Sequence, residues 1–478
     1  MEIKHKQQQE IPESAPAIFV LEDAKSLPEN FPKDQKEYIL RKIKDKEHPI
    51  TVNLLDTMKF VQLARKKNTV FRLKETYRKD ACKIASSVNK NKLKEVYITD
   101  YTDSPGLFEA FLEGFLLSNY QFLNYKTNKK KHPHTVNKVN IVSNNYSSKQ
   151  LAELQYLIEG VFFARDLTNH PVSYLSAEKL AEEIEKSGKS AGFNVEIFEK
   201  KRIEALRMGG LLAVNKGSFD PPTFTVMEWK PENAVNEKPY VLVGKGVVFD
   251  TGGMSLKPTS GSMDSMKCDM SGAAVVAGAM FAIAKNRLPV HVVGLVPATD
   301  NRPGNRAYVP QDVVTMHNGM TVEVMNTDAE GRMILADALS YADKYNPGLI
   351  IELSTLTGSA HAAIGHYGMV GMGTAGRNIF NKLVQSGENT YERVVEFPFW
   401  DEYDELIKSD VADMKNIGGR YAGAITAGKF LAQFTKHPFI HLDIAGPAFL
   451  DKKDSYRGTG GTGTGVRLLY DFLKNRSL

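Results

Sequence analysis

Ionisable side chains gather in three short, glycine-rich segments of this 478-residue sequence, at residues 244–258, 266–274 and 326–333. Burying an unpaired lysine or carboxylate is costly, so such groups are paired or metal-bound when they are buried. Four carboxylates that converge near loop ends could neutralise two divalent cations, and oxygen-rich ligation suits manganese, magnesium or zinc. Two such ions can share bridging carboxylates and activate a bridging water molecule. The four carboxylates are Asp250, Asp269, Asp328 and Glu330, and Lys245, Lys257 and Arg332 lie in the same segments.

Each of these features also has an ordinary structural explanation. A lysine between two glycines after a strand, such as Lys245, is commonly a solvated turn residue. An aspartate before an alanine-rich helix, such as Asp269, is commonly an N-cap. Asp328 and Glu330 could be acidic residues that the dipole of the following helix favours. The metal site is favoured because all of these features occur together in one chain.

The three segments adjoin predicted strands of an alternating pattern that begins near residue 170. Strands are predicted at residues 240–243, 289–296, 321–325, 348–353 and 439–444, and helices at 269–285 and 333–345. This alternation predicts a mostly parallel sheet with helices on both faces. In such sheets ligands bind beyond the carboxyl ends of the strands, which is where the charged residues fall.

The first part of the chain has a different composition and carries no recognisable chemistry. Residues 1–146 are rich in lysine, with strands predicted at 96–98 and 139–142 and a helix at 106–117. Apolar residues at helical spacing predict a linker helix over residues 147–168. The expected fold class is therefore α/β, with a smaller N-terminal α/β domain (1–146) and a C-terminal catalytic domain (169–478) built on a mostly parallel, helix-flanked sheet.

The overall composition excludes several classes of protein. A hydrophobic fraction of 42% and a charged fraction of 24% are typical of a globular chain, and a net charge of +5 is mild for this length. Two cysteines cannot form a disulfide framework. The longest apolar segment, at residues 273–284, is shorter than the ~20 residues that span a bilayer, and no signal-peptide pattern is present. We expect a cytoplasmic protein without a membrane partner.

Several motifs resemble those of the leucyl aminopeptidase (cytosolic aminopeptidase) family. Residues 326–332, Asn-Thr-Asp-Ala-Glu-Gly-Arg, are similar to the diagnostic motif of that family. The spacing of the residues from Lys245 through Asp250 and Lys257 to Asp269 matches its first metal-binding segment. Further similar stretches lie at residues 164–169, 354–358, 415–424 and 441–446. The resemblance extends in order over about residues 150–470, which makes coincidence negligible.

The resemblance implies a two-metal aminopeptidase with a complete set of ligands. Asp250 and Glu330 would bridge both ions, which we expect to be manganese or zinc, with magnesium and cobalt as alternatives. Lys245 and Asp269 would complete the tighter site, and Asp328 would bind the readily exchanged ion. A neutral lysine amine is an unusual ligand, but two nearby dications should depress its pKa enough to expose the lone pair.

The resemblance also implies roles for residues that act on the substrate. Lys257 would stay charged and stabilise the oxyanion of the tetrahedral intermediate. Arg332 would hold a bicarbonate ion that acts as the base for the water. Met266, Thr355 and Gly358 would line the first side-chain pocket, which favours apolar residues such as leucine.

The substrate and the assembly follow from the same resemblance. The backbone of Leu356 would contact a peptide whose free amine binds a metal ion, so that only N-terminal peptide bonds are cut. Members of the family form hexamers, and a homohexamer is expected here on that ground alone.

Other functions compete with this interpretation. The basic tract at residues 126–134 could contact DNA phosphates, which would make the chain a DNA-binding or scaffold protein with a secondary peptidase activity. A charged run next to Pro133 is more typical of a solvated loop, so no nucleic acid partner is expected. A two-metal phosphoesterase would use the same carboxylates and is disfavoured by the resemblance alone. Residues 458–463 are interpreted as a loop, since the 15 residues after Gly463 are too few for a dinucleotide-binding unit.

Overall fold

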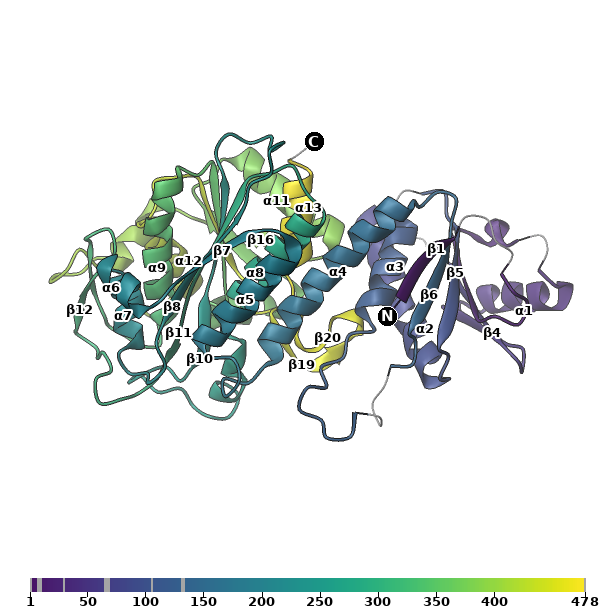
Figure 1. Cartoon of the computed structure of the whole chain (residues 1–478), viewed down its shortest axis with the longest axis horizontal. Helices are drawn as coiled ribbons and strands as arrows, with labels where there is room; N and C mark the ends of the chain where they lie inside the picture. The colour runs from purple at the N-terminus through teal and green to yellow at the C-terminus, as the bar shows by residue number, and fades with distance from the viewer. Residues whose placement is uncertain are drawn as a thin grey trace. The chain divides into compact units, whose positions relative to one another are not determined.

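The computed structural model of the chain describes residues 2–6, 11–28, 31–63, 69–104, 106–129 and 134–476. They form two compact units, Met1–Ile158 with Lys452–Gly458 and Glu159–Asp451 with Thr459–Leu478 (Figure 1). Each unit contains its own sheet of alternating strands and helices, which confirms the α/β fold class with a smaller N-terminal and a larger C-terminal part. The domain boundaries at residues 146 and 169 stay predictions.

The first unit has a six-stranded sheet in the order β1-β6-β5-β2-β4-β3, parallel except for β3. Helix α1 covers one face through Ile39, which packs with Phe19 and Leu21. The elements are β1 (Glu2–Lys6), β2 (Ala17–Leu21), α1 (Lys33–Lys44), β3 (Ile50–Asn53), β4 (Met58–Leu63), α2 (Val70–Lys90), β5 (Glu95–Tyr101), α3 (Leu107–Leu117) and β6 (Lys138–Val142). Helix α4 (Ser148–Asn169) follows, over the range where the periodicity predicts a helix.

The second unit has a nine-stranded sheet in the order β16-β15-β18-β14-β9-β11-β8-β7, with β10 paired to β11. Its strands are β7 (Asn194–Phe198), β8 (Thr223–Trp229), β9 (Tyr240–Gly244), β10 (Gly246–Asp250), β11 (Val292–Asn301), β14 (Leu349–Ser354), β15 (Met369–Gly373), β16 (Val394–Glu396) and β18 (Phe439–Asp443). Its helices are α5 (Ala177–Ala191), α6 (Lys200–Ala205), α7 (Gly209–Asn215), α8 (Ser271–Lys285), α9 (Glu330–Ala342), α10 (Gly358–Ile364), α11 (Arg377–Thr390), α12 (Gly423–Ala432) and α13 (Val466–Lys474). Short strands β12 (Val313–Thr315), β13 (Thr321–Glu323) and β17 (Met414–Lys415) form a separate sheet, and β19 (Phe449–Asp454) pairs with β20 (Gly458–Gly461).

Five parallel strands of the second unit set the position of the candidate site. Strands β9, β10, β11, β14 and β18 run in the same direction, so their carboxyl ends meet at one edge of the sheet. Helix α9 packs against β9 and β11, and its apolar residues share a core cluster with Val243 and Leu295. Helix α8 also lies against β9 and β14.

Helix α8 is apolar all round because it is enclosed by the protein. Almost all of its residues are buried, as expected for a helix without a polar face. The stretch Met263–Lys285, which includes α8, is long and apolar enough to cross a bilayer by composition alone, but 83% of its most apolar part is buried inside the protein. Helix α8 is therefore a buried core helix of this fold.

Two local expectations need correction or fall outside the described residues. Residues 458–463 were expected to be a loop, but Gly458–Gly461 form β20, which pairs with β19. Positive φ angles at Gly458, Gly460 and Gly463 let the chain turn within this glycine-rich stretch. The centre of the basic tract, residues 130–133, lies outside the described residues.

Candidate metal centre

The charged residues of the three segments lie where strands end and helices begin. Lys245 directly follows β9, and Asp250 is the last residue of β10. Asp269 lies between a short 3₁₀ helix, Met263–Cys268, and α8. Asp328 precedes α9, and Glu330 is its first residue. Residues from three separate segments are therefore brought to the carboxyl edge of one sheet.

Three carboxylates form the centre of this cluster. Asp250, Asp328 and Glu330 each present an oxygen atom, and these atoms all lie within 4.8 Å of one another. Asp250 and Glu330 are buried, with exposed fractions of 2% and 1%. Asp269 joins the group through Lys245, whose Nζ is 2.7 Å from Asp269 Oδ2 and 2.9 Å from Glu330 Oε1.

The second lysine lies on the other side of the carboxylates. Lys257 Nζ is 2.9 Å from Asp250 Oδ2 and 2.5 Å from Asp328 Oδ1. Each lysine therefore bridges two carboxylates, and the two ammonium groups leave two of the four negative charges uncompensated.

The donor set fits divalent cations. Glu330 Oε2 is buried and has no hydrogen-bond donor among the described residues. A buried carboxylate oxygen without a donor is costly in a folded protein, and a hard or borderline cation would satisfy it. An oxygen-rich set with two negative charges to spare is the chemistry expected of a site for manganese, magnesium or zinc.

The electrostatics of the cluster show the same deficit of positive charge. Burial, followed by repulsion from Asp250 and Glu330, raises the pKa of Asp328 to about 7. Burial also raises the pKa of Glu330 and of Asp269. Burial disfavours the ammonium of Lys245, but the carboxylates of Asp269 and Glu330 outweigh it and raise the lysine pKa. Bound dications would lower the pKa of each of these carboxylates and of Lys245.

The ordinary explanations for two of these residues do not hold in the structure. Asp269 is not the N-cap of α8, because Met270 occupies that position and no side chain caps the helix. Instead Asp269 Oδ1 accepts a hydrogen bond of 2.7 Å from Thr355 Oγ1. Lys245 is buried, with an exposed fraction of 3%, so it is not a solvated turn residue.

Two glycines make room for the cluster. A Cβ atom at Gly331 would lie 2.5 Å from Lys245 Cε and 2.7 Å from its Nζ, so a larger residue there would displace the lysine side chain. Gly252 has a φ of +85°, and a Cβ there would lie 2.5 Å from the carbonyl oxygen of Ser255. The glycine-rich character of the segments is thus a requirement of the site geometry.

Arg332 is the third residue of α9 and is also buried. Its Nη1 donates a hydrogen bond of 2.7 Å to the carbonyl oxygen of Asn416, whereas its Nε has no partner among the described residues. Burial lowers the pKa of Arg332 to about 10, so the side chain remains a cation at neutral pH. A buried guanidinium with a free N–H group is suited to hold a planar anion.

The residues predicted to contact substrate follow β14 or lie in the 3₁₀ helix. Thr355 lies against the charged cluster, because its carbonyl oxygen also accepts a hydrogen bond of 3.2 Å from Lys245 Nζ. Leu356 packs partly buried against the main core cluster of the second unit. Gly358 begins α10 with open space at its Cβ position, and Met266 is half-buried in the 3₁₀ helix. Met266 adjoins the cluster, because its carbonyl oxygen accepts a hydrogen bond of 3.3 Å from the backbone N–H of Asp269. The substrate-binding roles of Met266 and Gly358 stay predictions.

Two buried residues that support the site were not singled out from the sequence. Asp443, at the end of β18, accepts hydrogen bonds from Leu356 N (3.3 Å) and Thr357 Oγ1 (2.7 Å) and so fixes the loop after β14. Asn301, at the end of β11, donates to Asp250 Oδ1 at 2.8 Å. Asp443 lies in the stretch 441–446 that resembles the family, whereas Asn301 lies beyond the strand predicted at residues 289–296 and had no signal in the sequence.

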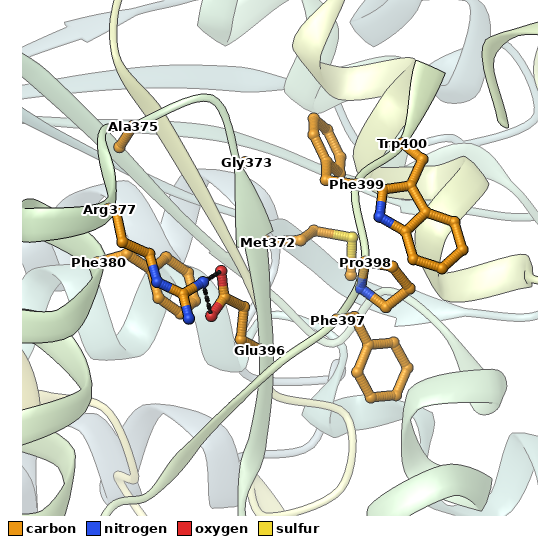
Figure 2. A pocket seen from close by; sticks show the side chains of 10 residues that line it. All are labelled: Met372, Gly373, Ala375, Arg377, Phe380, Glu396, Phe397, Pro398, Phe399 and Trp400. Carbon is orange, nitrogen blue, oxygen red and sulfur yellow. Dashed lines mark hydrogen bonds and ion pairs between the residues drawn. The ribbon is translucent and has the colours of Figure 1, made fainter. Parts of the chain in front are cut away.

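A separate hollow on the second unit contains none of the predicted site residues. It has a volume of about 380 Å³ and is lined by Phe397, Phe399 and Trp400 on one side. The guanidinium of Arg377 faces the carboxylate of Glu396 on the other side, with contacts of 2.6 and 2.5 Å (Figure 2). This hollow offers no cluster of metal-binding groups comparable to that around Asp250.

Comparison with known proteins identifies relatives of the chain. The cytosol aminopeptidase family, catalytic domain, matches residues 162–470. A protein of Chlorobaculum tepidum called "Probable cytosol aminopeptidase" is 56% identical over 318 residues, which cover 66% of this chain and 62% of that protein. The chain therefore spans less than two thirds of the length of this relative. A protein of the same name from Chlorobium limicola is 45% identical over 426 residues, which cover 84% of both chains.

Solved structures with the same fold include two enzymes. The bottromycin maturation enzyme BotP in complex with Mn has a TM-score of 0.85 and 27% identity, covering 97% of this chain and all of BotP. A mutant of tomato leucine aminopeptidase has a TM-score of 0.86 and 25% identity, covering 99% of this chain and 96% of that one. Both similarities extend over both compact units of the chain.

Proposed function

The chain belongs to the cytosol aminopeptidase family, and on this premise we propose that it is a metal-dependent aminopeptidase that hydrolyses the N-terminal bond of peptides. The observation that carries the proposal is the buried cluster of Asp250, Asp328 and Glu330, whose oxygens lie within 4.8 Å of one another. A hydrolase that uses a serine or cysteine nucleophile would not need this cluster of carboxylates. The manganese bound by BotP supports a divalent metal here as well.

The metal ligands in this proposal are Lys245, Asp250, Asp269, Asp328 and Glu330. When bound, two divalent cations would supply an activated water for hydrolysis and an anchor for the free amine of the peptide. Glu330 contacts Lys245 and Asp250 contacts Lys257, and in this proposal these two carboxylates would serve both ions. Lys245 would act as a ligand only in its neutral form, for which it must leave its ion pairs with Asp269 and Glu330.

Lys257 and Arg332 would act on the reacting groups. Lys257 is the more exposed of the two lysines, with 14% of its side chain accessible, and can therefore face a substrate. Its ammonium would donate a hydrogen bond to the scissile carbonyl oxygen as negative charge develops there. Arg332 would hold bicarbonate at its free N–H group and so provide a base for the hydrolysis.

The expected substrates are peptides with leucine or another apolar residue at the N-terminus. Thr355 stands at the edge of the cluster, and with Met266 and Gly358 it would form a side-chain pocket without a cation to pair with an acidic residue. The backbone of Leu356 would contact the bound peptide. These assignments follow the family resemblance and the position of the loop after β14.

The wider setting of the enzyme is proposed on the same resemblance. We infer a homohexamer in the cytoplasm, with the catalytic domain at residues 169–478, the linker helix at 147–168 and an N-terminal domain of unassigned role at 1–146. No described feature of the chain favours the alternative of a DNA-binding or scaffold protein.

A panel of N-terminal amino-acid amides tests the proposal directly. The protein would be stripped of metal, reconstituted separately with Mn, Zn, Co and Mg, and assayed on leucine, methionine, aspartate and glutamate amides. We expect faster cleavage of the leucine and methionine amides and no cleavage of an N-acetylated peptide. Cleavage of a blocked peptide at an internal bond would refute the assignment.

A further inference from the structure

Asn301 connects two of the three segments that form the metal centre. It is the last residue of β11 and is completely buried. Its Nδ2 donates two hydrogen bonds, one of 2.8 Å to Asp250 Oδ1 and one of 3.0 Å to the carbonyl oxygen of Thr327. A single neutral side chain therefore joins the end of β10 to the loop before α9.

The first of these bonds determines which oxygen of Asp250 faces the cluster. Asp250 Oδ1 accepts hydrogen bonds from Asn301 and, at 2.8 Å, from the backbone N–H of Gly252. These two donors hold Oδ1 on the protein side, which leaves Oδ2 toward Lys257 at 2.9 Å. The backbone supports the arrangement, because the carbonyl oxygen of Asn301 accepts bonds from Thr251 N (3.0 Å) and Thr251 Oγ1 (2.8 Å).

The second bond fixes the peptide that precedes Asp328. The carbonyl oxygen of Thr327 also accepts a bond of 3.0 Å from the hydroxyl of Tyr308. The Thr327 hydroxyl in turn donates to the carbonyl oxygen of Gly252 at 2.7 Å. The hydroxyl bond connects the loop that carries Asp328 to the loop after Asp250, and the bonds from Asn301 and Tyr308 connect it to the end of β11 and the segment that follows.

The pairing of β10 with β11 shows why a side-chain hydrogen bond from Asn301 to Asp250 is needed. The two strands pair in register at Gly246 and Val247, but the register shifts before Asp250, which pairs with Asn301. The backbone alone therefore does not hold the end of β10 in regular ladder geometry. The Asn301 amide supplies the fixed contact at the position where the ladder is irregular.

We propose that Asn301 is a positioning residue that sets the orientation of Asp250 relative to the Asp328–Glu330 segment and thereby the affinity of the site for divalent cations. The inference rests on the proposed metal centre and adds a residue that would touch neither metal nor substrate. An amide suits this place because it supplies two donors without adding a cation that would compete for the carboxylates. An aspartate there would place a further carboxylate against Asp250.

Metal affinity of an Asn301 variant tests the proposal. Metal-free wild-type protein, Asn301→Ala and Asn301→Asp would be titrated with Mn²⁺, and free Mn²⁺ would be followed by electron paramagnetic resonance. Loss of a residue that orients a ligand typically weakens metal affinity about 10–100-fold, and we expect Asn301→Ala in this range and Asn301→Asp at least as weak. Saturating Mn²⁺ should restore most of the kcat of Asn301→Ala.

Asn215 provides a matched control in the same unit. It is also buried, and its Nδ2 donates to the carbonyl oxygen of Asp220 (2.8 Å) and to Thr299 Oγ1 (3.1 Å), away from the carboxylates. Asn215→Ala should lower the melting temperature as Asn301→Ala does, but leave the Kd for Mn²⁺ unchanged.

The possible outcomes separate this inference from the proposed function. If Asn301→Ala loses stability but binds Mn²⁺ with the wild-type Kd, Asn301 has a structural role only and the inference is wrong. Where Asn301→Ala does not fold, Asn301→Ser carries the same test, since its short hydroxyl cannot reach both acceptors. A wild-type protein that binds no divalent cation would instead overturn the metal centre itself.

Discussion

Replacement of Lys257 by alanine separates catalysis from metal binding. The ammonium lies 2.9 Å from Asp250 Oδ2 and 2.5 Å from Asp328 Oδ1, and 14% of its side chain is exposed. It is therefore anchored by two carboxylates and largely shielded from water, which are the conditions under which a charged donor stabilises an oxyanion effectively. Loss of one such donor costs about 10²–10³-fold in kcat, or about 2.7–4 kcal/mol.

The same geometry predicts the effect of this substitution on metal content. In the metal-free protein the Lys257 ammonium pairs with Asp250 and Asp328 and so competes with a cation for both. Lys257→Ala should therefore bind divalent metal at least as well as the wild type. Lys245→Ala should lose metal from the tighter site, because it removes a proposed ligand.

Metal content by mass spectrometry and kcat on leucine amide would be measured for each variant. Lys238→Ala serves as the control, since this exposed lysine precedes β9 at the amino end of the strand, opposite the site. It should match the wild type in both measurements. The reasoning is refuted if Lys257→Ala loses metal while Lys245→Ala retains it.

Three further predictions follow from contacts at the site. Thr355→Val removes the hydroxyl that donates to Asp269 Oδ1 at 2.7 Å, and should weaken Mn²⁺ binding about 10-fold by calorimetry; an unchanged Kd would argue against this contact. Gly331→Ala should displace Lys245, because the new Cβ would lie 2.5 Å from Lys245 Cε, and should lower both melting temperature and Mn²⁺ affinity; normal metal binding would contradict the packing. The affinity of the metal-free enzyme for Mn²⁺ should rise with pH between pH 5 and pH 8, because a cation must displace the proton of Asp328, whose pKa burial raises to about 7, and that of Lys245, whose pKa is also raised. A pH-independent Kd over this range would oppose that view, and Asp328→Asn should make the dependence shallower below about pH 7.

The proton on Asp328 also affects stability, with a definite sign. Its folded pKa lies above the ordinary value for aspartate, so between about pH 4 and pH 7 the folded metal-free protein binds more protons than the unfolded chain. This residue therefore favours the fold at low pH, and its contribution is lost as the pH rises through about 7. Bound metal would remove the effect.

The sequence predicted the alternating strands and the parallel sheet because buried strands such as Tyr240–Gly244 are continuously apolar. It also predicted which charged residues belong to one cluster. Lys245 and Asp250 adjoin strands whose carboxyl ends meet at one edge of the sheet, and Asp269 and Glu330 lie where helices α8 and α9 begin. Their individual roles as ligands and catalysts stay predictions of the resemblance.

The supporting residues could not be predicted in the same way. An asparagine at the end of a strand, such as Asn301, has no local signal, because its two acceptors come from residues 51 and 26 positions away in the sequence. The position of Asp269 before a helix indicates a helix cap. In the folded chain its two carboxylate oxygens instead contact Thr355 and Lys245. Such preferences arise from tertiary contacts rather than from neighbours in the sequence.

Metal depletion and reconstitution of the wild-type protein tests the central claim most directly. Turnover of leucine amide would be measured alongside metal content, before chelation, after exhaustive chelation and after addition of Mn²⁺ or Zn²⁺. Activity should be lost with the metal and return with it, whereas Asp250→Ala and Glu330→Ala should neither bind metal nor recover activity. Full turnover by a protein whose metal has been verifiably removed would contradict the central claim.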